Sequence, residues 1–534
     1  MKKLIAYDII HIYGGTYMYK ENKILIGKSK EKELSILLDK ANRHGLITGA
    51  SGSGKTITLK VMAESFSDAG VPVLLADVKG DLGGTALPGE PSEALEKRLS
   101  SLGINDFEYK NFPVRFWDIF GEFGHPIRTS IDAVGSEILS MMLGLSEAQE
   151  GVLAIVFKIA KDNDWKIDDI KDLRLLLQFV GDNKNEFITS YGNITTQTIG
   201  VIQRCLLTLE NQGADKFFGQ PELDIHDFIA VDNNGKGIIN ILHAVKLFNS
   251  PDLYASFLLW LLTNLFNKMP EVGDLDKPKM VFFFDEAHLL FNGMPQYRLK
   301  QIVQVVKLIR SRGIGLYFIS QSPTDIPNEV IAQLGNRVQH TLRAYTPSEQ
   351  RTVKVAADAF RTNPEFDTAE AILALGTGEA LVSFQNEKGE PEVVEKATIL
   401  PPQSKMGTID DITRNKIINS SIIVGKYEEA IERDSAYEEL DKLVKEKLEA
   451  EEEERQRIAE EKQRKEEEKA AEKQAKLEEK EKKEKEREEA KQKREEEKAK
   501  KSTIQYKLGK KVANKTADKL INKGLNSLFK NFFK

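Results

Sequence analysis

The stretch LITGASGSGKTITLK, residues 46–60, contains the most specific pattern in this sequence. Its glycines and lysine have the spacing G-x-x-x-x-G-K-T, which lies between a short apolar run and a helix-forming segment. Glycines allow successive backbone N–H groups to curl around a phosphate without a Cβ in the way. The spacing therefore predicts a phosphate loop between a strand and a helix. The residues expected to contact the nucleotide are Gly49, Ala50, Ser51, Gly52, Ser53, Gly54, Lys55 and Thr56.

Two residues of this loop have predicted roles in chemistry. Lys55 is expected to reach the β and γ phosphates of ATP and to assist catalysis there. The hydroxyl of Thr56 is expected to bind Mg²⁺. A glycine-rich turn without a ligand is the alternative interpretation, and the flanking strand and helix patterns favour the phosphate loop over it.

A pair of acids follows a second apolar run. In VFFFDEAH, residues 281–288, four apolar residues precede Asp285 and Glu286. Asp285 is predicted to hold the Mg²⁺ ion through its water shell, and Glu286 is predicted to polarise the attacking water. The alternative is a solvated acid at the end of a strand. The adjacent glutamate favours a hydrolysing motor, so ATP and Mg²⁺ are the predicted cofactors.

Three further polar residues lie near apolar strands. Gln321, in FISQSP, follows one strand and is predicted to sense the γ-phosphate or its water; a capping amide is the alternative. Arg310 and Arg312, in KLIRSRGIG, end the helix before that strand. Either arginine could stabilise phosphoryl charge in a neighbouring subunit. Favourable placement of cations at a helix C-terminus is the other interpretation, and the two stay open.

The segment VLLADVKGDLGG, residues 73–84, contains another polar cluster after a strand. Asp77, Lys79 and Asp81 are expected at the carboxyl edge of a parallel sheet, where ligands bind. They could couple the nucleotide state to a pore or subunit interface. A turn that needs Asp and Gly explains them equally well.

Short apolar runs alternate with helical stretches, which predicts an α/β fold with a mainly parallel sheet. The N-terminal part is expected to contain a strand at KILIG and a helix at residues 31–42. The predicted parts are a β-rich lead-in (1–45), the first part of an ATPase core (46–124), a helical insertion (125–270), the second part of the core (271–400), a linker with an amphipathic helix (401–448), a charged spacer (449–500) and a basic amphipathic tail (501–534).

The spacer consists almost entirely of Glu, Lys, Arg, Gln and Ala. Apolar residues such as Ile458 and Leu477 are too scattered for the a and d positions of a coiled coil. A single solvated helix held by i,i+4 ion pairs is favoured, and a disordered linker is the alternative. In the tail, aromatic and aliphatic residues alternate with lysines, so a protein partner or a membrane surface is favoured over DNA phosphates.

Composition limits the remaining classes. Of 534 residues, 30% are charged, above the usual quarter, so part of the chain is not expected to be globular. The single cysteine, Cys205, excludes an intrachain disulfide and is expected to pack in the core. We find no signal sequence and no apolar run long enough to span a membrane, which predicts a cytoplasmic protein. The net charge of −6 argues against a uniformly basic nucleic-acid binder.

Together these motifs resemble the HerA/FtsK superfamily of P-loop ATPases, and most closely its YjgR-like branch. The resemblance covers residues from about 20 to 440. The segments that carry it are GLITGASGSGKTITLK, VLLADVKGDLGG, FFFDEAHLLF, IRSRGIGLYFISQSPTDIP, LGNRVQHTLRAYTP and RDSAYEEL.

The resemblance implies a RecA-like core and a ring-shaped hexamer that translocates double-stranded DNA. By that resemblance, Lys55 and Thr56 are the Walker A pair, and Asp285 and Glu286 the Walker B pair. Gln321 would be the sensor and Arg310 the finger that acts in trans.

One departure concerns the N-terminus. Archaeal HerA-type proteins have a β-barrel before the phosphate loop, whereas about 45 residues precede it here, which puts the usual nuclease-docking surface in doubt. The leading hypothesis is a Mg²⁺-dependent ATPase that moves DNA. The alternative is a nucleotide-gated scaffold that tethers a protein or membrane partner through the spacer and tail.

Overall fold

The computed structural model describes residues 18–499 except 31, 293 and 295. Contacts divide the chain into two compact units, which meet between Leu443 and Val444. The first unit contains the sheet and its helices, and the second contains most of the charged helix. The N-terminal residues 1–17 and the predicted tail at 501–534 lie outside the described residues.

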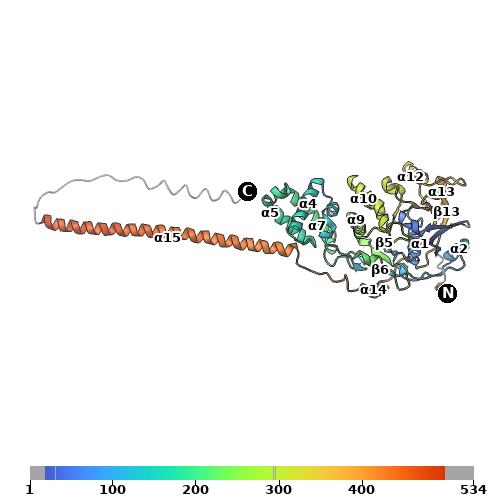
Figure 1. Cartoon of the computed structure of the whole chain (residues 1–534), viewed down its shortest axis with the longest axis horizontal. Helices are drawn as coiled ribbons and strands as arrows, with labels where there is room; N and C mark the ends of the chain where they lie inside the picture. The colour runs from blue at the N-terminus through green and yellow to red at the C-terminus, as the bar shows by residue number, and fades with distance from the viewer. Residues whose placement is uncertain (1–17, 31, 293, 295, 500–534) are drawn as a thin grey trace, which may run out of the picture. The chain divides into compact units, whose positions relative to one another are not determined.

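Thirteen strands of the described chain form one mixed sheet (Figure 1). Its central part is parallel and continues through eight strands, which confirms the predicted fold class. In sheet order these are β11 (Asn336–Gln339), β4 (Gly45–Thr48), β10 (Ile314–Ser320), β9 (Met280–Phe284), β5 (Val73–Asp77), β8 (Ile239–His243), β6 (Val114–Asp118) and β7 (His125–Pro126).

An antiparallel extension continues the sheet beyond β11. It contains β12 (Glu379–Ser383), β13 (Glu395–Ile399), β2 (Lys23–Ser29), β1 (Tyr19–Lys20) and β3 (Lys32–Leu37), the last of which pairs with β2. The segment predicted as a helix at 31–42 is therefore wrong in its first half. Leu34 and Ile36 alternate with more exposed neighbours and pair with β2. The alternation of buried and exposed residues, which is typical of a strand, therefore determines the structure here rather than the helix propensity of the segment.

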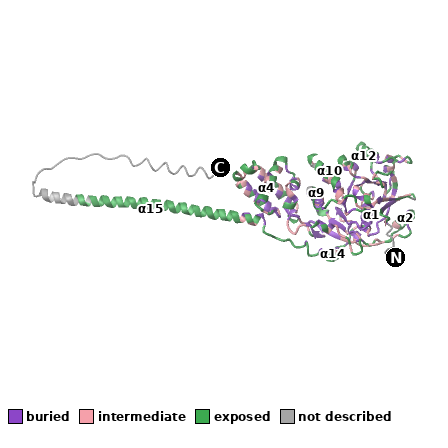
Figure 2. Cartoon of the chain, in the orientation of Figure 1, coloured by how far each residue is buried: buried purple, intermediate pink, exposed green. Residues whose placement is uncertain are grey.

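The central strands are buried on both faces, as expected of a parallel sheet (Figure 2). Phe282 and Phe284 belong to one apolar cluster, and Val281 and Phe283 to another on the opposite face. Helix α1 (Lys55–Asp68) packs in the second cluster. The first cluster contains α9 (Pro251–Lys268) and α10 (Gln296–Ile309). The sheet is thus covered by helices on both sides, which fixes its edges as the places for ligands.

The remaining helices complete the described part of the chain. They are α2 (Glu93–Ser101), α3 (Ile131–Met142), α4 (Glu147–Asp162), α5 (Ile170–Asp182), α6 (Lys184–Tyr191), α7 (Thr196–Asn211), α8 (Val245–Phe248), α11 (Asn328–Ile331), α12 (Pro347–Asp358), α13 (Thr368–Ala374), α14 (Asp411–Asn419) and α15 (Ala436–Ala499). None of the described helices is long and apolar enough to span a bilayer.

The predicted helical insertion at 125–270 also contains strands. It supplies α3 to α9, but β8 lies within it and occupies a central position between β5 and β6. The polar side chain of Asn240 in β8 is fully buried, and its carbonyl accepts a hydrogen bond from Trp117 Nε1 at 2.9 Å. Because the strand sequence INILH mixes polar and apolar residues, its burial is not evident from periodicity alone.

Residues 401–435 connect the last strand to the charged helix and are fixed at both ends. The buried carboxylate of Glu64 in α1 accepts hydrogen bonds from the backbone N–H groups of Gln403 at 2.7 Å and Ser404 at 3.3 Å. At the other end, Arg433 pairs with Asp168 at 2.5 Å. The sequence segment RDSAYEEL thus contains a docking contact onto the helical region.

Helix α15 is continuous over 64 residues. Between its start and the end of its described side chains, ion pairs join residues four apart, for example Lys465 to Glu461 at 2.6 Å and Lys476 to Glu472 at 2.7 Å. A helix of this length extends about 95 Å at ~1.5 Å per residue. The single solvated helix is thus the correct prediction for the spacer, and the disordered linker is not.

Candidate nucleotide-binding site

Four neighbouring parallel strands end at the same edge of the sheet. In the order β4, β10, β9 and β5, their carboxyl ends lead into the phosphate loop, Gln321, Asp285 and the turn around Lys79. The strand before Gln321 lies between the strand of the phosphate loop and the strand of Asp285. Since neighbouring strands are about 4.8 Å apart, these residues converge although more than two hundred positions separate them.

The glycines of the phosphate loop have conformations that other residues disfavour. Gly49 has φ +156° and Gly54 has φ +116°. A Cβ on Gly49 would lie 2.5 Å from the Cβ of His340, and a Cβ on Gly54 would lie 3.2 Å from the Cα of Gly378. A Cβ on Gly52, at φ +77°, would meet open space. The first and last glycines thus permit close packing of the loop, and the middle one permits its curvature.

Lys55 begins α1 and points back into the loop. Its Nζ donates hydrogen bonds to the carbonyl oxygens of Gly49 at 2.5 Å and Ala50 at 3.1 Å. Burial lowers the pKa of Lys55, and the charges of Glu286 and Asp285 act in the opposite direction. The ammonium therefore lies within electrostatic reach of both predicted acids. Thr56 follows in the first turn and is half-buried.

Asp285 and Glu286 follow β9 directly. Burial, followed by the charge of Glu286, raises the pKa of Asp285 to about 6. Glu286 has a left-handed backbone with φ +48°, an uncommon conformation for a non-glycine residue that often marks a functional site. Its Oε2 is buried without a hydrogen-bond partner in the described chain, and the Nδ1 of His288 lies 3.4 Å away. A buried carboxylate oxygen in this state is available to a water or substrate group.

Gln321 is exposed at the end of β10, so its amide can reach a ligand at the sheet edge. The adjacent loop is held by Asp325, which sequence reasoning missed. Its Oδ2 accepts hydrogen bonds from the Ser320 hydroxyl at 2.6 Å and the Ser322 N–H at 2.9 Å. The charge of Asp325 also acts on Lys55. The Ser-Pro-Thr-Asp pattern, which resembles a capping box, was the available signal for this turn.

The cluster after β5 separates into two kinds of residue. The carboxylate of Asp77 accepts hydrogen bonds from three backbone N–H groups, those of Gly80 at 2.7 Å, Asp81 at 3.1 Å and Leu82 at 3.1 Å. These bonds favour the turn interpretation for Asp77.

Lys79, in the same turn, is exposed. Its positive charge acts to lower the pKa of Lys55 and that of Asp285. Lys79 therefore belongs to the electrostatic environment of the site.

The two arginines lie away from this edge. Both belong to the 3₁₀ turn Arg310–Arg312 that precedes the amino end of β10. Since β10 has seven residues, its two ends are roughly 20 Å apart at about 3.3 Å per residue. Arg310 and Gln321 therefore lie at opposite ends of one strand, and the structure does not bring Arg310 to the phosphate loop of its own subunit.

Arg312 is held within its own subunit. Its guanidinium donates to the carbonyl oxygen of Met269 at 2.9 Å and stacks over Phe266 at 5.1 Å. It also lies 3.7 Å from Glu271. The side chain of Arg310 is half-buried, and Asn42 donates to its backbone oxygen at 3.4 Å. These contacts favour a structural role for Arg312 and leave Arg310 as the better finger candidate.

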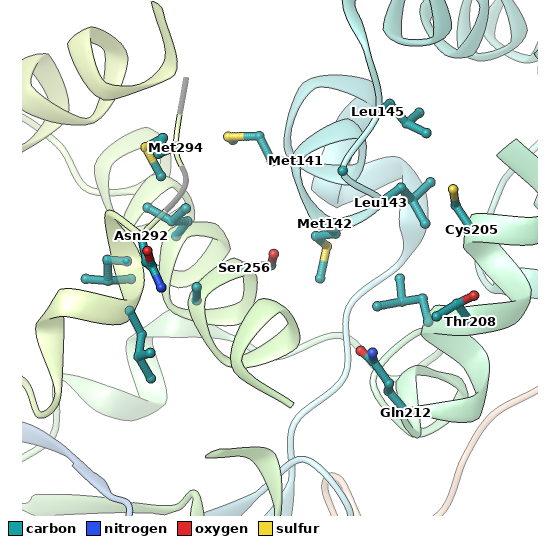
Figure 3. Close-up of a pocket in the computed structure, with 16 residues that line it drawn as sticks. Met141, Met142, Leu143, Leu145, Cys205, Thr208, Gln212, Ser256, Asn292 and Met294 are labelled. Carbon is teal, nitrogen blue, oxygen red and sulfur yellow. The ribbon is translucent and has the colours of Figure 1, made fainter. Parts of the chain in front are cut away.

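A cavity of about 420 Å³ is lined by residues of α3, α7, α9 and the segment 289–294 (Figure 3). Met141, Cys205, Ser256 and Met294 are among its lining residues. Cys205 is half-buried and packs against the larger apolar cluster. None of the predicted nucleotide-contacting residues lines this cavity.

Comparisons with known proteins identify the family of this chain. The family described as "Helicase HerA-like C-terminal" matches residues 22–531. This chain belongs to the HerA-like helicase family. It is a P-loop ATPase with a mainly parallel sheet, and the resemblance to the HerA/FtsK superfamily is confirmed.

Similar curated proteins are archaeal. The DNA double-strand break repair helicase HerA of Sulfolobus acidocaldarius is 22% identical over 379 residues, which cover 68% of this chain and 67% of that protein. The protein of the same description from Sulfurisphaera tokodaii is 24% identical over 380 residues, with the same coverage.

Among solved structures, the plasmid coupling protein TrwB in complex with ADP and Mg²⁺ aligns with a TM-score of 0.44 and 15% identity, covering 70% of this chain and 88% of that one. VirB4 of Thermoanaerobacter pseudethanolicus has the same TM-score and identity, covering 72% and 97%.

Proposed function

We propose that this protein hydrolyses ATP with Mg²⁺ at the carboxyl edge of its sheet and uses the energy to translocate double-stranded DNA as a homo-oligomer, most simply a hexamer. Membership of the HerA-like helicase family supports the motor, and the names of the archaeal relatives support DNA as its cargo.

The loop from Gly49 to Thr56 would hold the triphosphate through its backbone N–H groups, while the ammonium of Lys55 neutralises charge on the β and γ phosphates. Mg²⁺ held by the Thr56 hydroxyl and, through its water shell, by the Asp285 carboxylate would supply further positive charge at the phosphate oxygens. Binding of the phosphates requires Lys55 to exchange its hydrogen bonds with the loop carbonyls for the ligand.

Glu286 is the proposed base. Its buried Oε2, which has no hydrogen-bond partner among the described residues, would accept a hydrogen bond from the attacking water. It would take the proton of that water as the oxygen bonds to the γ-phosphorus and the bond from the γ-phosphorus to the bridging oxygen breaks, which releases ADP. The amide of Gln321 would contact the γ-phosphate or that water. When the γ-phosphate leaves after hydrolysis, Gln321 would lose this contact, and the change would reach the sheet through β10.

The observation that best supports an oligomer is that Arg310 and the phosphate loop lie at opposite ends of the sheet, separated by the length of β10. An arginine at the amino edge cannot complete the site of its own subunit, but it can meet the carboxyl edge of a neighbour in a head-to-tail ring. Arg310 of a neighbouring subunit would stabilise charge on the transferring phosphoryl group.

The test of the motor is the ATPase rate of the purified chain with and without long double-stranded DNA, at low and at physiological salt. We expect stimulation by DNA, because a translocase couples turnover to its track, and we expect it to weaken with salt. No stimulation together with no salt-sensitive binding would exclude DNA translocation.

A second function is favoured by α15, since catalysis does not need a solvated helix of 64 residues. The ATPase could act as a nucleotide-gated scaffold that tethers a protein or membrane partner. Removing residues 444–534 separates the two functions. Unchanged DNA-stimulated turnover with lost localisation supports tethering in addition to translocation, and lost turnover assigns the segment to assembly.

A further inference from the structure

Two histidines are buried at opposite edges of the parallel sheet. His340 follows β11 at the carboxyl edge and is fully buried, and His44 precedes β4 at the amino edge and is 2% exposed. Burial lowers the pKa of each to about 4, so both imidazoles are neutral near pH 7. Each ring contacts two separate segments of the chain. The pair therefore provides a matched comparison of one residue type in two positions.

His340 is joined to the phosphate loop through the backbone. Its N–H donates to the carbonyl oxygen of Thr48, the last residue of β4, at 2.7 Å. The carbonyl oxygen of the next residue, Thr341, accepts a hydrogen bond from the N–H of Ala50 at 2.9 Å. The start of the loop is therefore an extension of the pairing between β4 and β11.

The ring of His340 joins the loop helix to the antiparallel extension. Nδ1 lies 2.9 Å from the carbonyl oxygen of Glu379, which can only accept, so Nδ1 carries the proton. Nε2 must then accept, and the hydroxyl of Thr58 in the first turn of α1 donates to it at 2.9 Å. One neutral imidazole thus links α1 to the start of β12.

The loop is packed closely between these two segments. The hypothetical Cβ of Gly49 would collide with His340, and the N–H of Gly378 donates to the carbonyl oxygen of Ser53 at 3.0 Å. Gly378 is itself held by Arg98, whose guanidinium donates to its carbonyl oxygen and whose Nε donates to Ile399 at 2.9 Å. These contacts hold both sides of the loop against the segments around His340 and Gly378.

We propose that His340 is a positioning residue that holds the phosphate loop in the conformation that receives the β and γ phosphates of ATP, by bonding Thr58 on one side and Glu379 on the other. This inference rests on the proposed nucleotide site. His340 does not contact the nucleotide, because both of its ring nitrogens are occupied by protein groups. Its removal leaves Lys55, Asp285 and Glu286 in place and loosens the loop that they serve.

His44 is the control because it makes equivalent contacts elsewhere. Its Nδ1 accepts a hydrogen bond from the N–H of Leu316 at 3.0 Å, and its Nε2 donates to the carbonyl oxygen of Val306 at 2.8 Å. Neither partner belongs to the phosphate loop. If both histidines have a purely structural role, His44→Ala and His340→Ala variants that lose equal stability should also weaken nucleotide binding equally.

The experiment measures the dissociation constant of a fluorescent, non-hydrolysable ATP analogue with the full chain, together with Tm and the KM and kcat for ATP. Because His340→Ala removes the hydrogen bonds to Thr58 and Glu379, we expect it to weaken analogue binding and raise KM roughly tenfold or more, with a smaller change in kcat. His44→Ala is expected to lower Tm similarly while the dissociation constant stays within about twofold.

Two further variants keep the inference testable if His340→Ala does not fold. Thr58→Val removes the donor with almost no change in volume, and His340→Gln retains an acceptor near the position of Nε2. We expect Thr58→Val to weaken analogue binding several-fold, which is about 1 kcal/mol by the usual conversion, and His340→Gln to bind more tightly than His340→Ala.

Equal binding by the wild type and Thr58→Val, or equal losses for His44→Ala and His340→Ala, would overturn the inference. Failure of the proposed nucleotide site is a different outcome. In that case the wild type and Lys55→Ala bind the analogue equally, whatever happens at His340.

Discussion

The two edges of the parallel sheet have different chemistry. The carboxyl edge holds the phosphate loop, the acids Asp285 and Glu286, and Gln321, whereas the amino edge holds Arg310 and the intramolecular contacts of Arg312. The first edge has a lysine and two carboxylates within electrostatic reach of one another, and one buried carboxylate oxygen there has no hydrogen-bond partner in the part of the chain that the structure describes. The second has a half-buried arginine that cannot reach the first within one subunit. Under the proposed function, one subunit would therefore contain both halves of a site that only a neighbouring subunit can complete.

The largest effect is expected from the carboxyl edge. Lys55→Ala removes the ammonium that the loop carbonyls hold in place, and we expect loss of nucleotide binding and of all turnover. Titration with a fluorescent ATP analogue checks this. Lys158→Ala is the control, because this exposed lysine pairs with Asp162 on α4, outside the site, and it should retain the affinity of the wild type. Comparable binding by Lys55→Ala and the wild type would mean that the loop does not hold the phosphates.

The next largest effect is expected from the amino edge. Arg310→Ala should lower kcat by on the order of 10³-fold while binding of the ATP analogue is preserved, because its role is confined to the transition state of a neighbouring site. The matched control is Arg312→Ala. This change removes a hydrogen bond and a ring contact within the subunit, so it should lower Tm and leave kcat nearly unchanged. A loss of turnover in Arg312→Ala alone would exchange the two assignments.

A somewhat smaller effect on turnover is expected at the proposed base. Glu286→Gln keeps the shape of the side chain but cannot accept the proton, so turnover should fall by about 10²-fold or more with analogue binding retained. A single-turnover measurement separates the chemical step from product release. Brisk hydrolysis by Glu286→Gln would show that another group is the base.

The smallest expected effect is on the pH dependence of the free energy of unfolding, and the histidines at the two edges should contribute to it equally. The pKa values of His44 and His340 are about 4, below the ordinary value of 6.5. Between these values the unfolded chain binds protons that the folded chain does not, so the free energy of unfolding should fall as pH drops below 6.5. Each histidine accounts for about 2 kcal/mol between pH 6.5 and pH 5.

Urea unfolding at pH 7 and pH 5 measures this dependence. Other titrating groups cancel when the wild type is compared with His44→Gln and His340→Gln, which should each lose less stability on acidification than the wild type does. An unchanged pH dependence in both variants would mean that the histidines are not buried as neutral rings.

Much of the carboxyl edge could be predicted from the sequence because its signals are local. Glycine spacing dictates the loop, and the apolar runs before Asp285 and Gln321 indicate buried parallel strands whose carboxyl ends must converge. The charged helix was also predictable, since i,i+4 pairs are visible in the sequence. These features depend on residues within one or two helical turns of each other.

Other features depend on partners that are distant in the sequence. The buried strand β8 contains Asn240, whose polarity is tolerated only because Trp117 and backbone carbonyls satisfy it. The first half of the predicted helix at 31–42 is a strand because it forms antiparallel backbone hydrogen bonds with β2. The role of His340 depends on Thr58 and Glu379, which local patterns do not connect. Whether Arg310 or Arg312 is available could be decided only from the contacts of Arg312 with Met269 and Phe266.

The central claim is that a site is completed between subunits, and complementation tests it most directly. Chains with Arg310→Ala and chains with Glu286→Gln, each differently tagged, are co-expressed, and the mixed oligomers are purified through both tags. In these oligomers, some Arg310→Ala subunits receive an intact arginine from a Glu286→Gln neighbour.

The ATPase rate of the mixed oligomers is the deciding measurement. With random mixing we predict that about a quarter of the sites regain turnover, whereas each variant alone stays inactive. Mixing Arg310→Ala chains with chains that have both substitutions is the control and should restore nothing. Purified mixed oligomers with no turnover above that control would contradict the account.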